Sequence, residues 1–186
     1  MMKLTLAVMF LALAVVPAAP QSPPPAGQKL TLSSQAVGGY NAIQRDLLEA
    51  AELMPEADYL FKPTPEMRPF GQLISHVALT QFRTCSLLQG GQNPKAAEKE
   101  ETPRSKAVLI ALLKESATFC NPLVTDMTDE GMLQLVKVGP VEGARGGMLV
   151  GLSVHGNEVY GTIAVYLRLK GLVPPTTARQ KPAPTK

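Results

Sequence analysis

Apolar residues recur at intervals of three and four positions along four separate stretches of the chain. The first stretch is the clearest, with apolar residues at Val37, Tyr40, Ile43, Leu47, Ala51 and Met54. Such a stripe predicts a helix that buries one face. Four stretches of this kind favour an all-α fold class, a four-helix bundle in which the stripes meet in one core.

Capping residues and prolines place the ends of the first three helices. Ser33 or Ser34 can cap the first helix, and the segment "KPTPEMRP" ends it because proline disfavours helix in the preceding residue. Pro69 suits the first turn of a second helix, which runs until "QGGQNP". The charged segment "KAAEKEET" predicts an exposed connection, and Thr102 with Pro103 indicates the start of the third helix.

The buried stripes of the last two helices contain polar as well as apolar residues. In the third helix the stripe is Leu109, Leu112, Ser116, Cys120 and Leu123. In the fourth, expected from about Met148 to Lys170, it is Met148, Leu152, His155, Val159, Thr162, Ile163, Tyr166 and Leu169. Gly171 and the following prolines end that helix. The glycine-rich segment 125–147 fits either a short strand or a loop, and the links before the second and fourth helices are long enough to cross the bundle.

The two ends of the chain have a different character from the bundle. Lys3 precedes an apolar run of 13 residues, Leu4 to Val16, and small residues follow. This order predicts a secretory signal peptide over 1–20. The run is too short to span a bilayer, which takes about 20 residues. We therefore expect an exported protein, periplasmic or extracellular, without a stable membrane anchor after cleavage.

These boundaries divide the chain into four parts. The signal peptide is followed by a proline-rich disordered leader over 21–32, the bundle over 33–173 and a disordered basic tail over 174–186. The net charge is +3, and no basic cluster marks one face, so the sequence does not indicate nucleic-acid binding.

Cys85 and Cys120 are the only cysteines. In an oxidising compartment they favour a single disulfide, with two buried thiols as the alternative. They are too far apart in sequence to resemble the close cysteine pairs of thiol oxidoreductases.

His76 and His155 are the only histidines, and each lies on or beside the buried stripe of a helix. Imidazole is the commonest metal ligand, and bundle cores assemble metal sites from facing helices. A catalytic zinc usually has three protein ligands. Val159, one helical turn after His155, cannot ligate a metal. Glu158 is the candidate substitute, since it lies about 60° round the helix from His155.

The segments "MRPFGQLISHVA" and "HGNEVYGTIAVYLRLKGLVPP", together with the two cysteines, resemble the DinB superfamily (DinB/YfiT-like), in particular its exported bacterial branch. The resemblance covers roughly residues 35–176. It implies a four-helix bundle with zinc or nickel held by three histidines, and characterised relatives include thiol transferases. Two of the ligands fall on His76 and His155, and the third falls on Val159.

Two functional hypotheses follow. In the first, the protein is an exported binding or structural module whose two-histidine metal site is degenerate and which lacks established catalysis. In the second, it is a metal-dependent hydrolase-like or transferase-like enzyme that uses His76, His155 and a substitute third ligand. The expected cofactor is accordingly either a divalent metal, zinc or nickel, or no cofactor at all. We expect a small molecule as ligand, and a homodimer is an open alternative to a monomer.

Overall fold

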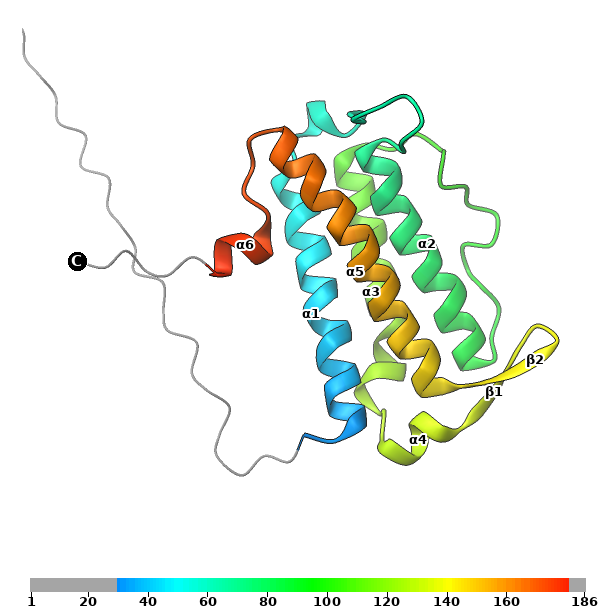
Figure 1. Cartoon of the computed structure of the whole chain (residues 1–186). Coiled ribbons are helices and arrows are strands. Elements are labelled where there is room, and N and C mark those ends of the chain that lie inside the picture. The colour runs from blue at the N-terminus through cyan, green and yellow to red at the C-terminus, as the bar shows by residue number, and fades with distance from the viewer. Residues whose placement is uncertain (1–29, 181–186) are drawn as a thin grey trace, which may run out of the picture. The chain divides into compact units, whose positions relative to one another are not determined.

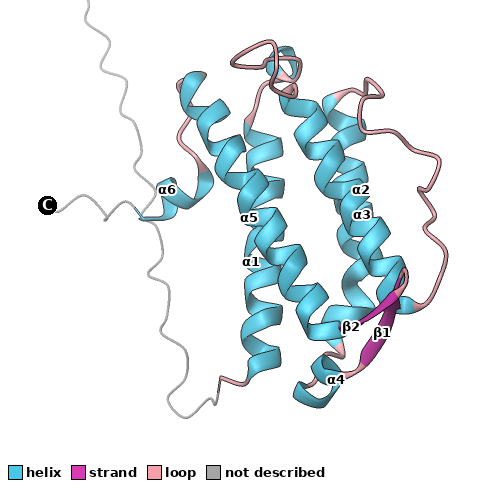
Figure 2. Ribbon diagram, turned by 45° about the vertical axis from the view of Figure 1, so that its right-hand side comes forward, coloured by secondary structure: helices cyan, strands magenta, loops and turns pink. Residues whose placement is uncertain are grey.

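The computed structural model describes residues 30–180. The predicted signal peptide and nearly all of the predicted leader lie outside the described residues, as does the chain after residue 180. The described part forms six α-helices and one β-hairpin (Figure 2). The long helices are α1 (Leu32–Leu53), α2 (Phe70–Gln89), α3 (Lys106–Thr125) and α5 (Arg145–Leu169). They form the predicted all-α four-helix bundle.

The four long helices surround one core in a fixed order. Helix α1 packs against α5 and α3, while α2 packs against α3 and α5. Helices α1 and α5 run in one direction along the bundle, and α2 and α3 run in the other (Figure 1). The connection over 90–105 therefore returns along the whole bundle, because α2 and α3 are parallel neighbours. The links before α2 and α5 are also long enough to cross, but each stays at one end of the bundle (Figure 1).

Side-chain caps set the helix ends, in part at other residues than expected. Thr31, and neither Ser33 nor Ser34, is the N-cap of α1, and Ser34 completes a capping box with it. The Ser105 side chain caps α3, so this helix begins after the Thr102-Pro103 signal. Helix α2 follows Pro69 as predicted and ends at Gly90, whose φ of 66° is left-handed.

The segment before α5 has more regular structure than the sequence predicted. A short helix, α4 (Asp129–Leu133), precedes an antiparallel hairpin of β1 (Leu135–Val138) and β2 (Val141–Ala144). Helix α5 begins at Arg145, before the expected start at Met148. Gly146 packs so closely on Met132 of α4 that a Cβ would lie 2.7 Å from that side chain. The glycine therefore serves close packing at the start of a helix.

The core is mainly aliphatic, but Tyr166, Phe70 and Phe82 are its largest fully buried side chains. All five predicted core residues of α3 are buried, and Cys120 forms a disulfide with Cys85 of α2 across a Cα–Cα distance of 5.4 Å. Leu169 is an exception to the predicted stripe, since it is 57% exposed at the end of α5. By length and composition α3 is the one described helix apolar enough to cross a membrane, a property it shares with core helices of soluble bundles.

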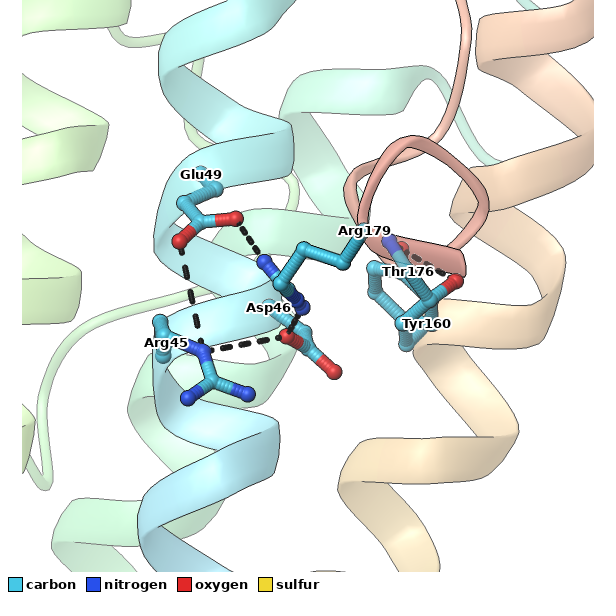
Figure 3. Close-up of polar contacts among 6 residues, drawn as sticks. All are labelled: Arg45, Asp46, Glu49, Tyr160, Thr176 and Arg179. Atoms are coloured by element: carbon cyan, nitrogen blue, oxygen red, sulfur yellow. Dashed lines mark hydrogen bonds and ion pairs between the residues drawn. The ribbon is translucent and has the colours of Figure 1, made fainter. Parts of the chain in front are cut away.

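The predicted disordered tail is helical at its start. Residues Pro175–Gln180 form α6, which packs against α1. Arg179 pairs with Asp46 and Glu49 of α1, and the Thr176 N–H donates to the Tyr160 hydroxyl of α5 at 3.0 Å (Figure 3). Three side chains of the bundle thus hold a segment whose composition predicted disorder.

Candidate functional site

The two histidines of the chain meet between α2 and α5. These helices are antiparallel neighbours, so His76 in the second turn of α2 faces His155 in the middle of α5. Their Nε2 atoms are 2.9 Å apart, a hydrogen-bond distance, and the ring centroids are 4.8 Å apart in an edge-on arrangement. Two residues 79 positions apart in sequence are thus joined directly.

A pocket of about 500 Å³ lies beside the histidine pair. It contains all four residues that the sequence assigned to the site, His76, His155, Glu158 and Val159. Its other walls are formed by Glu66, Met67, Arg68, Leu73, Thr162 and Tyr166. The Tyr166 hydroxyl donates to the backbone oxygen of Arg68 at 2.7 Å, which holds the "KPTPEMRP" segment against the end of the pocket.

The residues present do not supply the third ligand of a three-histidine metal site. Val159 is only 7% exposed and belongs to the apolar core. Glu158 is exposed, and its carboxylate makes no hydrogen bond or ion pair with residues 30–180. Within the same residues, no three His, Cys, Asp or Glu side chains are grouped so that they could hold a metal ion. The geometry therefore does not fit the three-ligand metal centre that the resemblance implied.

Glu100 is a site residue that the sequence reasoning missed. Its Oε1 atom lies 2.7 Å from Nδ1 of His76, on the opposite side of the imidazole from His155. Its other carboxylate oxygen lies 3.9 Å from the Arg68 guanidinium. Glu100 stands in the charged segment that the sequence predicted to be an exposed connection. Nothing in its local sequence distinguishes it from the neighbouring glutamates, and only the return path of the loop along α2 brings it to the histidine.

Further contacts fix this loop on the bundle. The Arg104 guanidinium donates to the hydroxyl of Ser75, which is buried and precedes His76 in sequence. Arg104 also pairs with Glu98 within the loop. On the far side, Lys95 forms an ion pair with Glu115 of α3 at 3.0 Å. Glu100 is thus presented to His76 by a segment anchored on both sides.

Burial shapes the electrostatics of the pair. Burial lowers the pKa of His155, and positive charge on His76 lowers it further, while the carboxylates of Glu158 and Glu100 act in the opposite direction. His155 is therefore a neutral imidazole at neutral pH. A neutral imidazole has one N–H donor and one acceptor nitrogen, so each nitrogen of His155 has a single role.

The cysteines do not contribute to this site. Cys85 and Cys120 pair with each other in a separate part of the core together with Tyr40, Leu88 and Leu149. The disulfide joins α2 to α3 and lines none of the pocket. Its role in the fold is that of a covalent link between parallel helices.

Comparison with known proteins identifies the fold. The sequence pattern of the DinB superfamily matches residues 40–152. The chain belongs to the DinB superfamily. No curated protein sequence matches it.

Solved structures of DinB-like proteins share the same bundle. A DinB-like protein from Bacillus cereus superposes with a TM-score of 0.63 at 16% identity, covering 75% of this chain and 93% of the other. A DinB-like protein from Bacillus subtilis gives 0.59 at 20% identity, with coverages of 74% and 92%. A conserved protein from Enterococcus faecalis gives 0.61 at 14% identity, with coverages of 76% and 98%. At these identities the similarity establishes the fold alone.

Proposed function

We propose that this protein is an exported DinB-like bundle in which the two-histidine metal site is degenerate and the pocket binds a small molecule without metal-dependent catalysis. The observation that carries the proposal is the presence of a valine, Val159, at the position of the third ligand. It lies one turn after His155 on the pocket wall, where the superfamily resemblance places a third ligand, and it is buried. An apolar side chain at this position packs in the core and offers no donor atom.

The two remaining imidazoles, those of His76 and His155, are hydrogen-bonded to each other. A catalytic zinc usually has three protein ligands and an open position for water or substrate. Here the Nε2 atoms of His76 and His155 are joined by a hydrogen bond, so neither Nε2 atom is free to coordinate a metal while that bond persists. A metal would have to break this bond and would gain only two ligands.

The pocket itself supports small-molecule binding. Its volume of about 500 Å³ falls within the usual range for ligand sites, about 300–1,000 Å³. Met67, Leu73 and Val159 provide apolar wall, and a few polar groups stand among them. This mixture is typical of sites that hold the body of a ligand by burial and orient it with hydrogen bonds.

Two features support export. The order of a charged residue, an apolar run and small residues at the N-terminus is that of a signal peptide. The Cys85–Cys120 disulfide is of a kind that persists in oxidising compartments and is rare in the cytosol.

Metal content tests the proposal. The mature, untagged protein is incubated with zinc or nickel, desalted and analysed by plasma mass spectrometry, beside a Val159→His variant. We expect the wild type to be empty and Val159→His to carry about one metal ion per chain. Val154→His is the matched control, because Val154 lies on the same helix but is 63% exposed. Near-stoichiometric metal in the wild type, or none in Val159→His, would contradict the degenerate-site proposal.

A second candidate function is a metal-dependent hydrolase-like or transferase-like enzyme with Glu158 as the substitute ligand. The observation in its favour is that Glu158 lines the same pocket as both histidines. If this is correct, the wild type binds metal and Glu158→Gln loses it. Glu66→Gln is the control, since Glu66 lines the same pocket from the segment before α2.

A further inference from the structure

Two hydrogen bonds in series connect a loop carboxylate to the pocket. Glu100 contacts Nδ1 of His76 at 2.7 Å, and Nε2 of His76 contacts Nε2 of His155 at 2.9 Å. We propose that Glu100 is a positioning residue that sets the tautomers of both histidines and thereby decides which nitrogen the pocket offers to a ligand. This inference rests on the proposed binding function, because it concerns the same pocket.

The tautomers follow from the donor and acceptor inventory. An ionised carboxylate only accepts hydrogen bonds, so the Nδ1 atom of His76 carries the proton that it donates to Glu100. In the neutral form of His76 this is the only ring proton, which leaves the Nε2 atom of His76 as an acceptor. The hydrogen bond between the rings must then be donated by the Nε2–H group of His155. The remaining nitrogen, Nδ1 of His155, is an acceptor.

Glu100 is placed to impose this order, since the hydrogen bond on one ring nitrogen sets the protonation of the other. Its side chain is 28% exposed and that of His76 is 20% exposed, so water competes little for their contact. Arg104 anchors the loop on Ser75, the residue before His76. Without Glu100 the imidazole of His76 is free to take the Nε2–H form that free histidine favours in water.

The ligand class follows from the resulting polarity. Nδ1 of His155 has no hydrogen-bond partner within residues 30–180, and the acidic residues Glu66 and Glu158 are also among those that line the pocket. The one arginine of the wall, Arg68, is near Glu100 at 3.9 Å. The pocket thus offers acceptors and net negative charge. It fits a small organic molecule that carries an N–H donor, above all an alkylammonium group.

Nitrogen-15 NMR of the imidazoles tests the tautomers directly. The untagged protein is first freed of metal with a chelator. The chain has only two histidines, so the spectrum contains two sets of imidazole nitrogen signals, which a His155→Asn variant assigns. Spectra are recorded on the alkaline plateau, about two pH units above the ordinary histidine pKa of about 6.5. We expect Nδ1–H for His76 and Nε2–H for His155. In Glu100→Ala both should reverse, because an Nε2–H group on His76 requires His155 to accept at Nε2.

The conservative variant separates positioning from mere folding. In Glu100→Gln the side-chain oxygen still accepts from Nδ1–H of His76, so both tautomers should stay as in the wild type. Glu101→Ala, at the exposed residue next to Glu100 in the same loop, should also leave them unchanged. A wild-type His76 in the Nε2–H form, or wild-type tautomers retained in Glu100→Ala, would overturn the proposal. If Glu100→Ala does not fold, the wild-type spectrum still decides it.

The ligand class is tested with two probes of equal length, n-butylammonium and butyrate. We expect the ammonium probe to shift the Nδ1 resonance of His155 and butyrate to leave it unchanged. A shift with butyrate alone, or with neither probe, would overturn the assigned class. Failure here is distinct from failure of the proposed function. Metal found in the wild type would contradict the degenerate-site proposal. The tautomers are measured separately, on protein freed of metal with a chelator.

Discussion

Gly156 of α5 lies so close to α1 that a Cβ atom on it would be 3.0 Å from Cγ1 of Ile43. This contact brings the two helices together directly beside His155. We expect Gly156→Ala to destabilise the protein by about 1–3 kcal/mol, because the added methyl group overpacks a buried contact. Chemical denaturation measures the loss.

The same helix offers a matched control at Gly161. A Cβ there would meet nothing within 4 Å. Gly161→Ala should therefore stabilise the protein by about 0.5–1 kcal/mol, through the lower helix propensity of glycine. If both substitutions change the free energy of unfolding alike, the close approach at Gly156 is not the cause.

Two buried tyrosines differ in what their hydroxyls contact. The Tyr59 hydroxyl donates to the backbone oxygen of Ala51 at 2.6 Å, whereas the Tyr40 hydroxyl is buried without a partner among residues 30–180. Tyr59→Phe should therefore lower the free energy of unfolding by about 1 kcal/mol. Tyr40→Phe should leave it unchanged or raise it by up to about 1 kcal/mol, since an unsatisfied hydroxyl is removed. Urea titrations of both variants at neutral pH provide the comparison.

The same tyrosines make the fold sensitive to alkali. Burial raises the pKa of Tyr40 and of Tyr59 above the ordinary tyrosine value. The unfolded chain therefore loses these protons first, and stability that is fully present below about pH 10 is lost as the pH rises further. In Tyr40→Phe the decline between about pH 10 and 11 should be shallower than in the wild type. An unchanged slope would mean that Tyr40 ionises equally in both states.

The disulfide should stabilise the bundle strongly. Cys85 and Cys120 close a loop with a sequence separation of 35, for which the chain-entropy account gives about 3–4 kcal/mol. A Cys85→Ala/Cys120→Ala double variant should unfold at a correspondingly lower urea concentration. Addition of a reductant should change the wild type and not the variant. If the reductant shifts both proteins equally, its effect does not pass through this bond.

The docking of α6 depends on charge. Arg179 pairs with Asp46, whose side chain is 11% exposed, and with Glu49. We expect Arg179→Ala to destabilise the protein by about 1 kcal/mol at low salt and by less at 1 M salt, where charges are screened. Gln180→Ala, at the exposed end of the same helix, should have no effect. Equal losses at both salt concentrations would indicate that the arginine acts through packing.

Local sequence patterns predicted the long helices well, because periodicity and caps are short-range properties. The buried stripe of α3 and the start of α2 after Pro69 lie where the sequence places them. The tail is different: its composition predicts disorder, yet Arg179 finds two carboxylates on α1, more than a hundred residues earlier. Such a contact has no local signature.

The candidate site likewise contains residues that local sequence predicts and one residue that it does not. His76, His155 and Val159 are predictable because helix periodicity places each of them on a known face. Glu100 is not, since its role depends on α2 and α3 being parallel, and no rule of local sequence determines the direction of a helix in a bundle. Only the arrangement of the whole chain shows which of several similar glutamates lies against the imidazole.

The disulfide has a consequence for chain continuity. Cys85 lies before the returning loop and Cys120 lies after it, so the whole of 90–105, Glu100 included, is enclosed in a covalent ring. A protease that cuts this exposed loop once would leave two fragments that remain joined through sulfur. In an oxidising compartment, a nicked molecule would keep its bundle together while the carboxylate was released from His76.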